Sequence, residues 1–192
     1  MTRITQAFDQ ATKPLLNVYF TAGYPQLEST ISVLKSLEAA GTDLVELGMP
    51  YSDPLADGET IQQSSSVALA NGMSIEKLFE QLAGARTEIS IPIILMGYLN
   101  PIMQFGAELF CEKCKEVGVD GLIIPDLPME LFDDEVMGNM LESSLKPSTM
   151  DASGWHDSCN GPGTTDGKFI QWLPISDQAQ SVVEDVKRIR NS

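Results

Sequence analysis

The sequence is poor in basic residues. Twelve lysines and arginines stand against 27 aspartates and glutamates, which gives a formal net charge of -15 at pH 7. A surface with this charge repels phosphate backbones and anionic lipids. The composition therefore argues against nucleic acids and membrane surfaces as partners.

Long apolar runs are also lacking. No stretch approaches the roughly 20 apolar residues that cross a bilayer, and the start of the chain lacks the apolar segment of a secretion signal. The chain contains only three cysteines, which fits a reducing compartment better than a disulfide framework. Together these features predict a cytoplasmic protein.

The residues that are present predict an α/β fold. Short apolar runs rich in Val, Ile, Leu and Tyr alternate with amphipathic stretches, as in strand-helix units around a parallel sheet. The predicted strands are 15–21, 43–48, 91–98 and 119–125. The predicted helices are 2–11, 27–41, 74–89 and 107–118, with one more that begins after Gly58.

The regular alternation ends at residue 133. Residues 134–168 are rich in Ser, Thr, Gly, Asp, Asn and Pro and have almost no periodicity, which predicts an irregular or disordered segment. Residues 169–192 contain a candidate strand and a candidate terminal helix. We predict a single domain over residues 1–192, with its regular β/α units in residues 1–133.

The stretch VELGMPYSDPLADGETIQ, residues 45–62, places a glutamate inside a predicted buried strand. Because side chains alternate along a strand, Glu46 shares one face with Leu44. If the sheet closes into a barrel, Glu46 lies near the end where such barrels carry catalytic groups. Burial raises the pKa of a carboxyl group and favours proton transfer near neutral pH. A structural glutamate held by backbone donors or by a lysine is the open alternative.

Two aspartates follow on the loop that Pro50 and Pro54 stiffen. On residue type alone, Asp53 is explained as a turn former and Asp57 as the N-cap of the next helix.

The same stretch resembles the motif of the tryptophan synthase alpha subunit family, E-hydrophobic-G-x-P-aromatic-S-D-P-hydrophobic-A-D-G-x-x-I-Q. Three further segments resemble parts of that family in the same order and spacing: YFTAGYP (19–25), ILMGYLNPIMQFG (94–106) and GVDGLIIPDLP (118–128). The resemblance covers residues 1–133.

This resemblance implies a (β/α)8 fold of the TIM-barrel type, incomplete or irregular after the fourth strand-helix unit. It also implies a lyase of tryptophan biosynthesis that cleaves indole-3-glycerol phosphate into indole and glyceraldehyde 3-phosphate, by a retro-aldol reaction without metal or organic cofactor. Glu46 matches the family's acid-base glutamate, which protonates indole C3. Asp57 matches the aspartate that accepts the indole N–H.

Two further groups of residues follow from the resemblance alone. Five match positions that line the indole pocket: Tyr19, Met96, Tyr98, Ile123 and Pro125. Four match the face that docks on a beta subunit: Pro50, Asp53, Asn100 and Asp126. The pyridoxal phosphate of that partner is not expected in this chain.

The family's late, glycine-rich phosphate site has no match in the sequence. Residues 159–167 contain Gly and Thr, but turn formation explains them more simply. The alternative function is therefore a catalytically impaired barrel remnant that docks on a beta subunit or acts as its effector. Another phosphate-binding barrel enzyme, such as an isomerase of the same pathway, is disfavoured by PYSDPLADG.

Four residues have the composition of a zinc site. Cys111 and Cys114 form C-x-x-C, and His156 and Cys159 form H-x-x-C. Because the first pair lies inside a predicted helix, no metal site is predicted.

Overall fold

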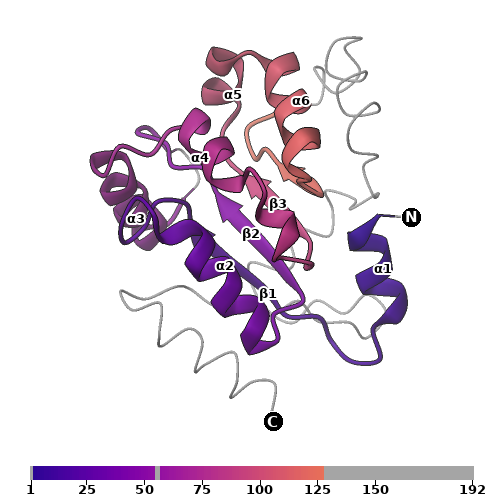
Figure 1. The fold of residues 1–192 in the computed structure, drawn as a ribbon. Helices are drawn as coiled ribbons and strands as arrows, with labels where there is room; N and C mark the ends of the chain where they lie inside the picture. The colour runs from indigo at the N-terminus through magenta and orange to yellow at the C-terminus, as the bar shows by residue number, and fades with distance from the viewer. Residues whose placement is uncertain (1, 55–56, 128–192) are drawn as a thin grey trace.

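A computed structural model describes residues 2–54 and 57–127 of the chain. Its centre is a four-stranded parallel sheet in the order β1-β2-β3-β4 (Figure 1). The strands are β1 (Asn17–Thr21), β2 (Leu44–Gly48), β3 (Ile93–Met96) and β4 (Gly121–Ile123). All four were predicted, and each lies within its predicted range. Because all four strands are parallel, their carboxyl ends lie at one edge of the sheet.

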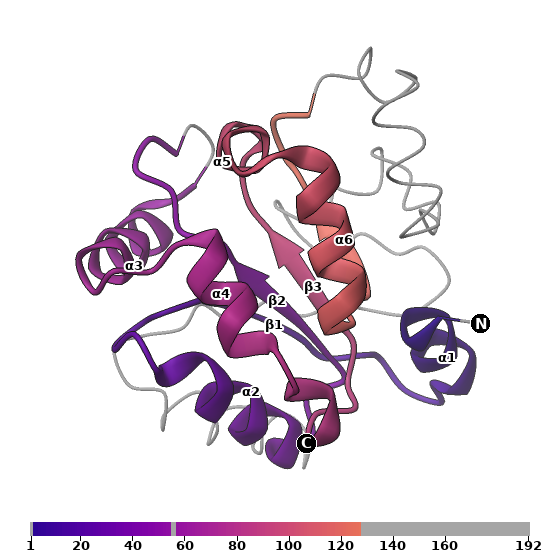
Figure 2. The ribbon, with the colours of Figure 1, turned by 45° about the horizontal axis from the view of Figure 1, so that its top comes forward.

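Helices connect these strands. They are α1 (Arg3–Gln10), α2 (Ser29–Ala40), α3 (Glu59–Ala70), α4 (Ile75–Leu82), the 3-10 helix η1 (Ala85–Thr87), α5 (Leu99–Phe105) and α6 (Ala107–Val117). Helices α2, α4 and α6 lie side by side over the same face of the sheet (Figures 1 and 2). Right-handed crossovers place helices on one face as long as the strand order does not reverse.

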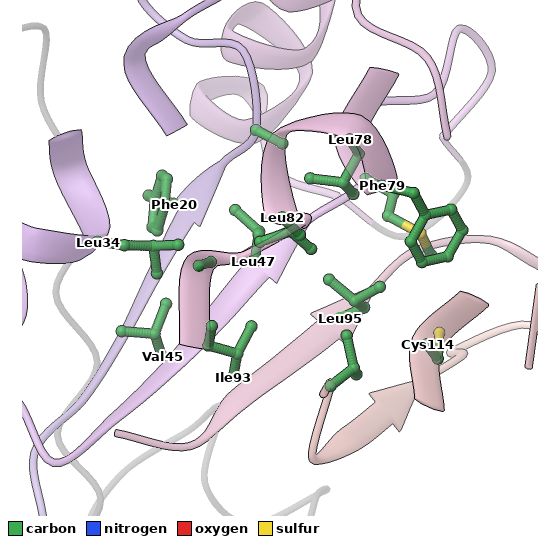
Figure 3. Packing of buried hydrophobic residues seen from close by; sticks show 14 of the residues in the cluster. Phe20, Leu34, Val45, Leu47, Leu78, Phe79, Leu82, Ile93, Leu95 and Cys114 are labelled. Carbon is green, nitrogen blue, oxygen red and sulfur yellow. The ribbon is translucent and has the colours of Figure 1, made fainter. Parts of the chain in front are cut away.

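The parallel register separates the two faces of the sheet. Val45 pairs with Val18 and Ile93, and Leu47 lies on the same face two residues further along β2. This face packs against Leu34 of α2 and the apolar side of α4 to form the core (Figure 3). The opposite face carries Glu46.

Local sequence explains where the helices begin and end. The Ser74 hydroxyl accepts a hydrogen bond from the Lys77 backbone N–H at 3.1 Å, so it caps the start of α4. Gly41 and Gly118 end α2 and α6 with φ values of 95° and 77°, in the left-handed region that favours glycine. Both glycine ends were predicted.

Two helix predictions need correction. The predicted helix 74–89 ends at Leu82, because Gly84 adopts φ 80° and redirects the chain into η1. Helix α5 was not predicted. Pro101 lies within the first turn of α5, where a missing backbone N–H breaks no intrahelical hydrogen bond.

Carboxylates hold the amino ends of the strands. Three of them accept backbone N–H groups at strand starts: Asp43 from Leu16 at 2.6 Å, Glu38 from Ser90 at 2.9 Å and Asp120 from Ile93 at 2.9 Å. Asp120 also forms ion pairs with Arg86 and with Arg3 of α1. In a (β/α)8 barrel, the fold predicted from the sequence, the amino ends of the strands contribute stability and the carboxyl ends carry the site.

Several predictions fall beyond the described part of the chain. They are the irregular segment 134–168, the candidate strand and helix within 169–192, and any irregularity of the barrel after the fourth unit. Among the helices that are described, none has the length and apolar character needed to cross a bilayer.

The core of this sheet predicts a difference between two leucine truncations. Leu47 is fully buried on the helix-covered face, whereas Leu109 of α6 is 45% exposed. We expect Leu47→Ala to lower the free energy of unfolding by about 2–5 kcal/mol, because it leaves a cavity. Leu109→Ala should change it by less than about 1 kcal/mol. Urea unfolding of both variants and the parent measures the difference, and equal losses would contradict the packing described above.

Candidate active site

Glu46 lies in the middle of β2 on the face of the sheet that Asn17 and Tyr19 share, and it is only 3% exposed. Asn17, also 3% exposed, donates from Nδ2 to Glu46 Oε1 at 2.6 Å. Glu46 Oε2 is buried and has no hydrogen-bond partner. A buried carboxyl group thus has one oxygen held and the other available.

This environment brings the titration of Glu46 near neutral pH. Burial disfavours the ionised form, and the hydrogen bond from Asn17 opposes that effect only partly, so the pKa of Glu46 is raised from 4.5 to about 7. The alternative of a structural glutamate required backbone donors or a lysine. The hydrogen-bond donor found on the carboxyl is instead the Asn17 side-chain amide.

Tyr19 lies directly beside Glu46 in the register and extends over Gly48. A Cβ atom at position 48 would collide with the hydroxyl and ring of Tyr19, so the glycine provides the space for this ring. Burial, first of all, raises the pKa of Tyr19 to about 12, and the charges of Asp57 and Glu46 act in the same direction. Both predicted catalytic carboxyl groups therefore lie within electrostatic range of one tyrosine.

A chain of hydroxyl groups links Tyr19 to α3. Tyr19 Oη and Thr21 Oγ1 are 3.4 Å apart, and Thr21 Oγ1 and Ser64 Oγ are 2.7 Å apart. Ser64 donates its proton to the carbonyl of Ile61 at 2.9 Å. Either hydroxyl of each pair can be the donor. These contacts connect the Tyr19 hydroxyl to α3 through Thr21 and Ser64.

Asp57 lies on the loop between β2 and α3. The N-cap of α3 is Gly58, and no side chain caps this helix, so the N-cap explanation of Asp57 is wrong. The Asp57 carboxyl instead hydrogen-bonds with Tyr98, which follows β3. Burial raises the pKa of Asp57, and the bond with Tyr98 opposes that rise.

The residues predicted to line the indole pocket occupy the carboxyl half of the sheet. The register pairs Gly48 with Met96 and Met96 with Ile123, which places both side chains on the Glu46 face. Tyr98 is buried at the start of α5, and Pro125 is exposed after β4. The structure therefore brings Tyr19, Met96 and Ile123 onto one face, with Tyr98 at its edge.

The residues predicted to dock on a partner lie at this same edge, three of them on loops and Asn100 in the first turn of α5. Asn100 Nδ2 donates to the Tyr51 hydroxyl at 3.0 Å, and the rings of Tyr51 and Tyr98 lie 5.3 Å apart. Asp126 Oδ1 accepts the backbone N–H of Leu99 at 2.8 Å and so ties the segment after β4 to the start of α5.

The two remaining members of this group follow β2. Pro50 is half-buried, and Asp53 is exposed and accepts from the Ser52 hydroxyl at 2.6 Å.

The cysteines of the C-x-x-C pair lie inside α6, as predicted. Both are buried free thiols, and burial raises the pKa of each. His156 and Cys159 lie outside the described residues. Within residues 2–54 and 57–127, no group of three or more His, Cys, Asp and Glu side chains is placed to hold a metal ion.

The sequence did not identify three residues of the candidate site: Asn17, Thr21 and Ser64. A signal existed for Asn17, because it is a polar residue in an otherwise apolar run, as Glu46 is. Ser64 gave none, since it stands in a run of three serines on a helix.

A parallel sheet whose strands follow chain order, with α2, α4 and α6 on one face (Figure 1), is the architecture of part of a TIM barrel, the class of α/β protein to which this chain is assigned. Comparison with known sequences specifies the class further. Residues 6–147 match the family described as "Tryptophan synthase alpha chain". The chain belongs to this family.

Comparison with individual proteins gives the same family. The chain is similar to the tryptophan synthase alpha chain of Flavobacterium johnsoniae, with 55% identity over 70% of this chain and 53% of the relative. Identity to that of Parabacteroides distasonis is 59%, over 67% of this chain and 50% of the relative. The crystal structure of tryptophan synthase subunit alpha from Legionella pneumophila superposes with a TM-score of 0.70 and 37% identity, over 75% of this chain and 56% of that one. The chain spans about half the length of the curated relatives that it matches.

The raised pKa of Glu46 predicts a pH-dependent penalty on stability. In the unfolded chain this carboxyl ionises near its ordinary pKa of 4.5, whereas the folded chain retains the proton up to about pH 7. The folded state therefore binds more protons between these values, and its stability falls as pH rises through this window. Below about pH 4.5 the raised pKa costs no stability, and above about pH 7 its full cost is present.

Glu46→Gln should remove this dependence, because its side chain stays neutral. We expect the unfolding free energy of Glu46→Gln, relative to that of the parent, to increase between about pH 4.5 and about pH 7 and to level off on either side. Urea unfolding of both proteins at a series of pH values measures the difference, in which the other carboxyl groups cancel. A difference that stays constant with pH would mean that Glu46 titrates normally.

Proposed function

We propose that this chain is a carbon-carbon lyase that cleaves indole-3-glycerol phosphate into indole and glyceraldehyde 3-phosphate. Membership of the tryptophan synthase alpha chain family supports the substrate and the reaction. The observation that carries the proposal is the buried Glu46 carboxyl, which has a pKa of about 7 and one oxygen without a partner. Such a group can both donate and accept a proton at neutral pH.

In the proposed reaction, Glu46 transfers its proton to indole C3, and the C2=C3 π electrons form the new C–H bond, which leaves positive charge on the ring. The bond between C3 and the glycerol side chain then breaks, and its electrons return to the ring and restore the C2=C3 double bond. The side-chain hydroxyl loses its proton to the Glu46 carboxylate as its carbon becomes the aldehyde of glyceraldehyde 3-phosphate. Glu46 is thereby protonated again for the next cycle.

Asp57 is proposed to act as the counter-charge to the indole ring. Protonation at C3 places positive charge on the ring, and a carboxylate that accepts the indole N–H stabilises it. The hydrogen bond from Tyr98 supports this role, because it favours the ionised form of Asp57.

The pocket and the partner complete the proposal. Tyr19, Met96, Tyr98, Ile123 and Pro125 are the proposed lining of the indole pocket. A flat aromatic ring requires a mainly apolar lining with few polar groups. We expect a tryptophan synthase beta subunit, with its own pyridoxal phosphate, to dock through Pro50, Asp53, Asn100 and Asp126. No metal or organic cofactor is proposed for this chain.

The catalytic assignment is tested by two isosteric substitutions. Glu46→Gln cannot transfer a proton, and Asp57→Asn cannot serve as a counter-charge. We expect each to lower kcat for indole release by about 100-fold or more. The assay measures indole formed from indole-3-glycerol phosphate, with and without a beta subunit.

Glu59→Gln is the matched control, because Glu59 is an exposed acid in the first turn of α3. It should retain the activity of the parent. Full activity in both Glu46→Gln and Asp57→Asn would refute the assigned roles. A parent chain that releases no indole but stimulates a beta subunit would favour the alternative of a docking remnant.

If a beta subunit docks on this edge of the sheet, reversing a charge there should weaken its binding. Asp53 is exposed on the loop after β2, so Asp53→Arg should weaken binding without unfolding the chain. We expect at least a roughly tenfold increase in Kd, measured by calorimetric titration of a beta subunit. Glu112→Arg on the exposed side of α6 is the control and should bind as the parent does. Equal affinities for both variants would place the docking face elsewhere.

A further inference from the structure

Asn17 is the residue closest to the chemistry of Glu46 that family resemblance did not single out. It is the first residue of β1 and lies on the same face as Glu46, one diagonal step across the register. Its Nδ2 donates to Glu46 Oε1 at 2.6 Å, and both side chains are 97% buried, each with 3% of its surface exposed. The Asn17 Oδ1 and Glu46 Oε2 atoms are both buried and lack partners.

We propose that Asn17 is a positioning residue for Glu46: by holding Oε1, it makes Oε2 the single oxygen that carries and exchanges the proton. This inference deepens the proposed function and depends on it for the meaning of the proton exchange. The claim that Asn17 binds the Glu46 carboxyl and shifts its pKa is independent of the reaction. It is supported by the Nδ2–Oε1 distance and by the burial of both residues.

The choice of an amide in this position has a chemical reason. A carboxyl group has two equivalent oxygens, and either can hold the proton unless the surroundings distinguish them. An amide N–H donates only, so it is compatible with a carbonyl oxygen and with a carboxylate oxygen but not with a protonated one. The proton of neutral Glu46 therefore resides on Oε2. After ionisation the same hydrogen bond persists, so the side chain does not need to move during the reaction.

An amide also leaves the charge of the site unchanged. Tyr19 of β1 interacts electrostatically with Glu46, with Asp57 of the loop before α3 and with Tyr98 after β3. Tyr19 is neutral near pH 7, because burial raises its pKa to about 12, and Asp57 adds negative charge. A lysine in place of Asn17 would stabilise the ionised carboxyl and lower its pKa, whereas an aspartate would compete for the proton. Asn17 stabilises the ionised form moderately and so keeps the pKa within reach of neutral pH.

The first test uses the unmodified chain. The side-chain amide signals of Asn17, assigned by through-bond NMR on isotope-labelled protein, are followed from about pH 5 to about pH 9. We expect them to shift with the same midpoint as the carboxyl carbon of Glu46, and to lose this transition in Glu46→Gln. Asn17 signals that do not titrate, or that titrate unchanged in Glu46→Gln, would overturn the proposal.

The second test removes the hydrogen bond. Asn17→Leu has a similar volume and no donor, so the midpoint of the Glu46 carbon should rise by about one pH unit. Thr42→Val is the matched control, because Thr42 is buried and its hydroxyl has no partner. It should leave the midpoint unchanged. An unchanged midpoint in Asn17→Leu contradicts the proposal; if that variant does not fold, Asn17→Ser, which is too short to reach Glu46, is measured instead.

Activity supplies a readout that a merely structural role would not change. Lyase activity that needs protonated Glu46 falls as pH rises through its pKa, so Asn17→Leu should move this limb of the kcat profile to higher pH by the same amount as the NMR midpoint. A parent chain without lyase activity whose Asn17 and Glu46 signals titrate together refutes the proposed function alone. An active parent whose Asn17 signals do not titrate refutes only the role of Asn17.

Discussion

The parallel register between β1, β2 and β3 is the constraint on which the structure depends. It aligns Val18, Val45 and Ile93 on one face and Tyr19, Glu46 and Ile94 on the other. The first face is buried beneath the helices, and this apolar burial stabilises the sheet. The stability gained there allows the second face to hold a carboxyl group in an unfavourable environment. A shift of one residue in β2 would move Glu46 into the core.

Most of the fold could be predicted because strand and helix periodicities are local. Short apolar runs identified all four strands, and Gly41 and Gly118 marked helix ends through a backbone conformation that glycine favours. Helix α5 was not predicted, although its proline is compatible with a helix. Pro101 breaks a helix in its interior but is tolerated in its first turn, and the letters do not give its position in the turn.

The site was only partly accessible to the same reasoning. Glu46 stood out because a carboxyl in an apolar strand needs a physical explanation, and the raised pKa follows from burial alone. Its partner Asn17 lies 29 residues earlier in the chain, so their contact depends on strand pairing. The bond between Asp57 and Tyr98 likewise joins loops after different strands. The residue types suggested the chemistry of the site, but the contacts between these residues could be known only from the folded structure.

Gly48 has one more consequence. Because its missing side chain leaves the room that the Tyr19 ring occupies, positions 19 and 48 form a steric pair on adjacent strands. A larger side chain at position 48 would displace the Tyr19 ring and disrupt the chain of hydroxyl groups that links Tyr19 to α3. The space beside Glu46 is thus set by two positions that can change only together.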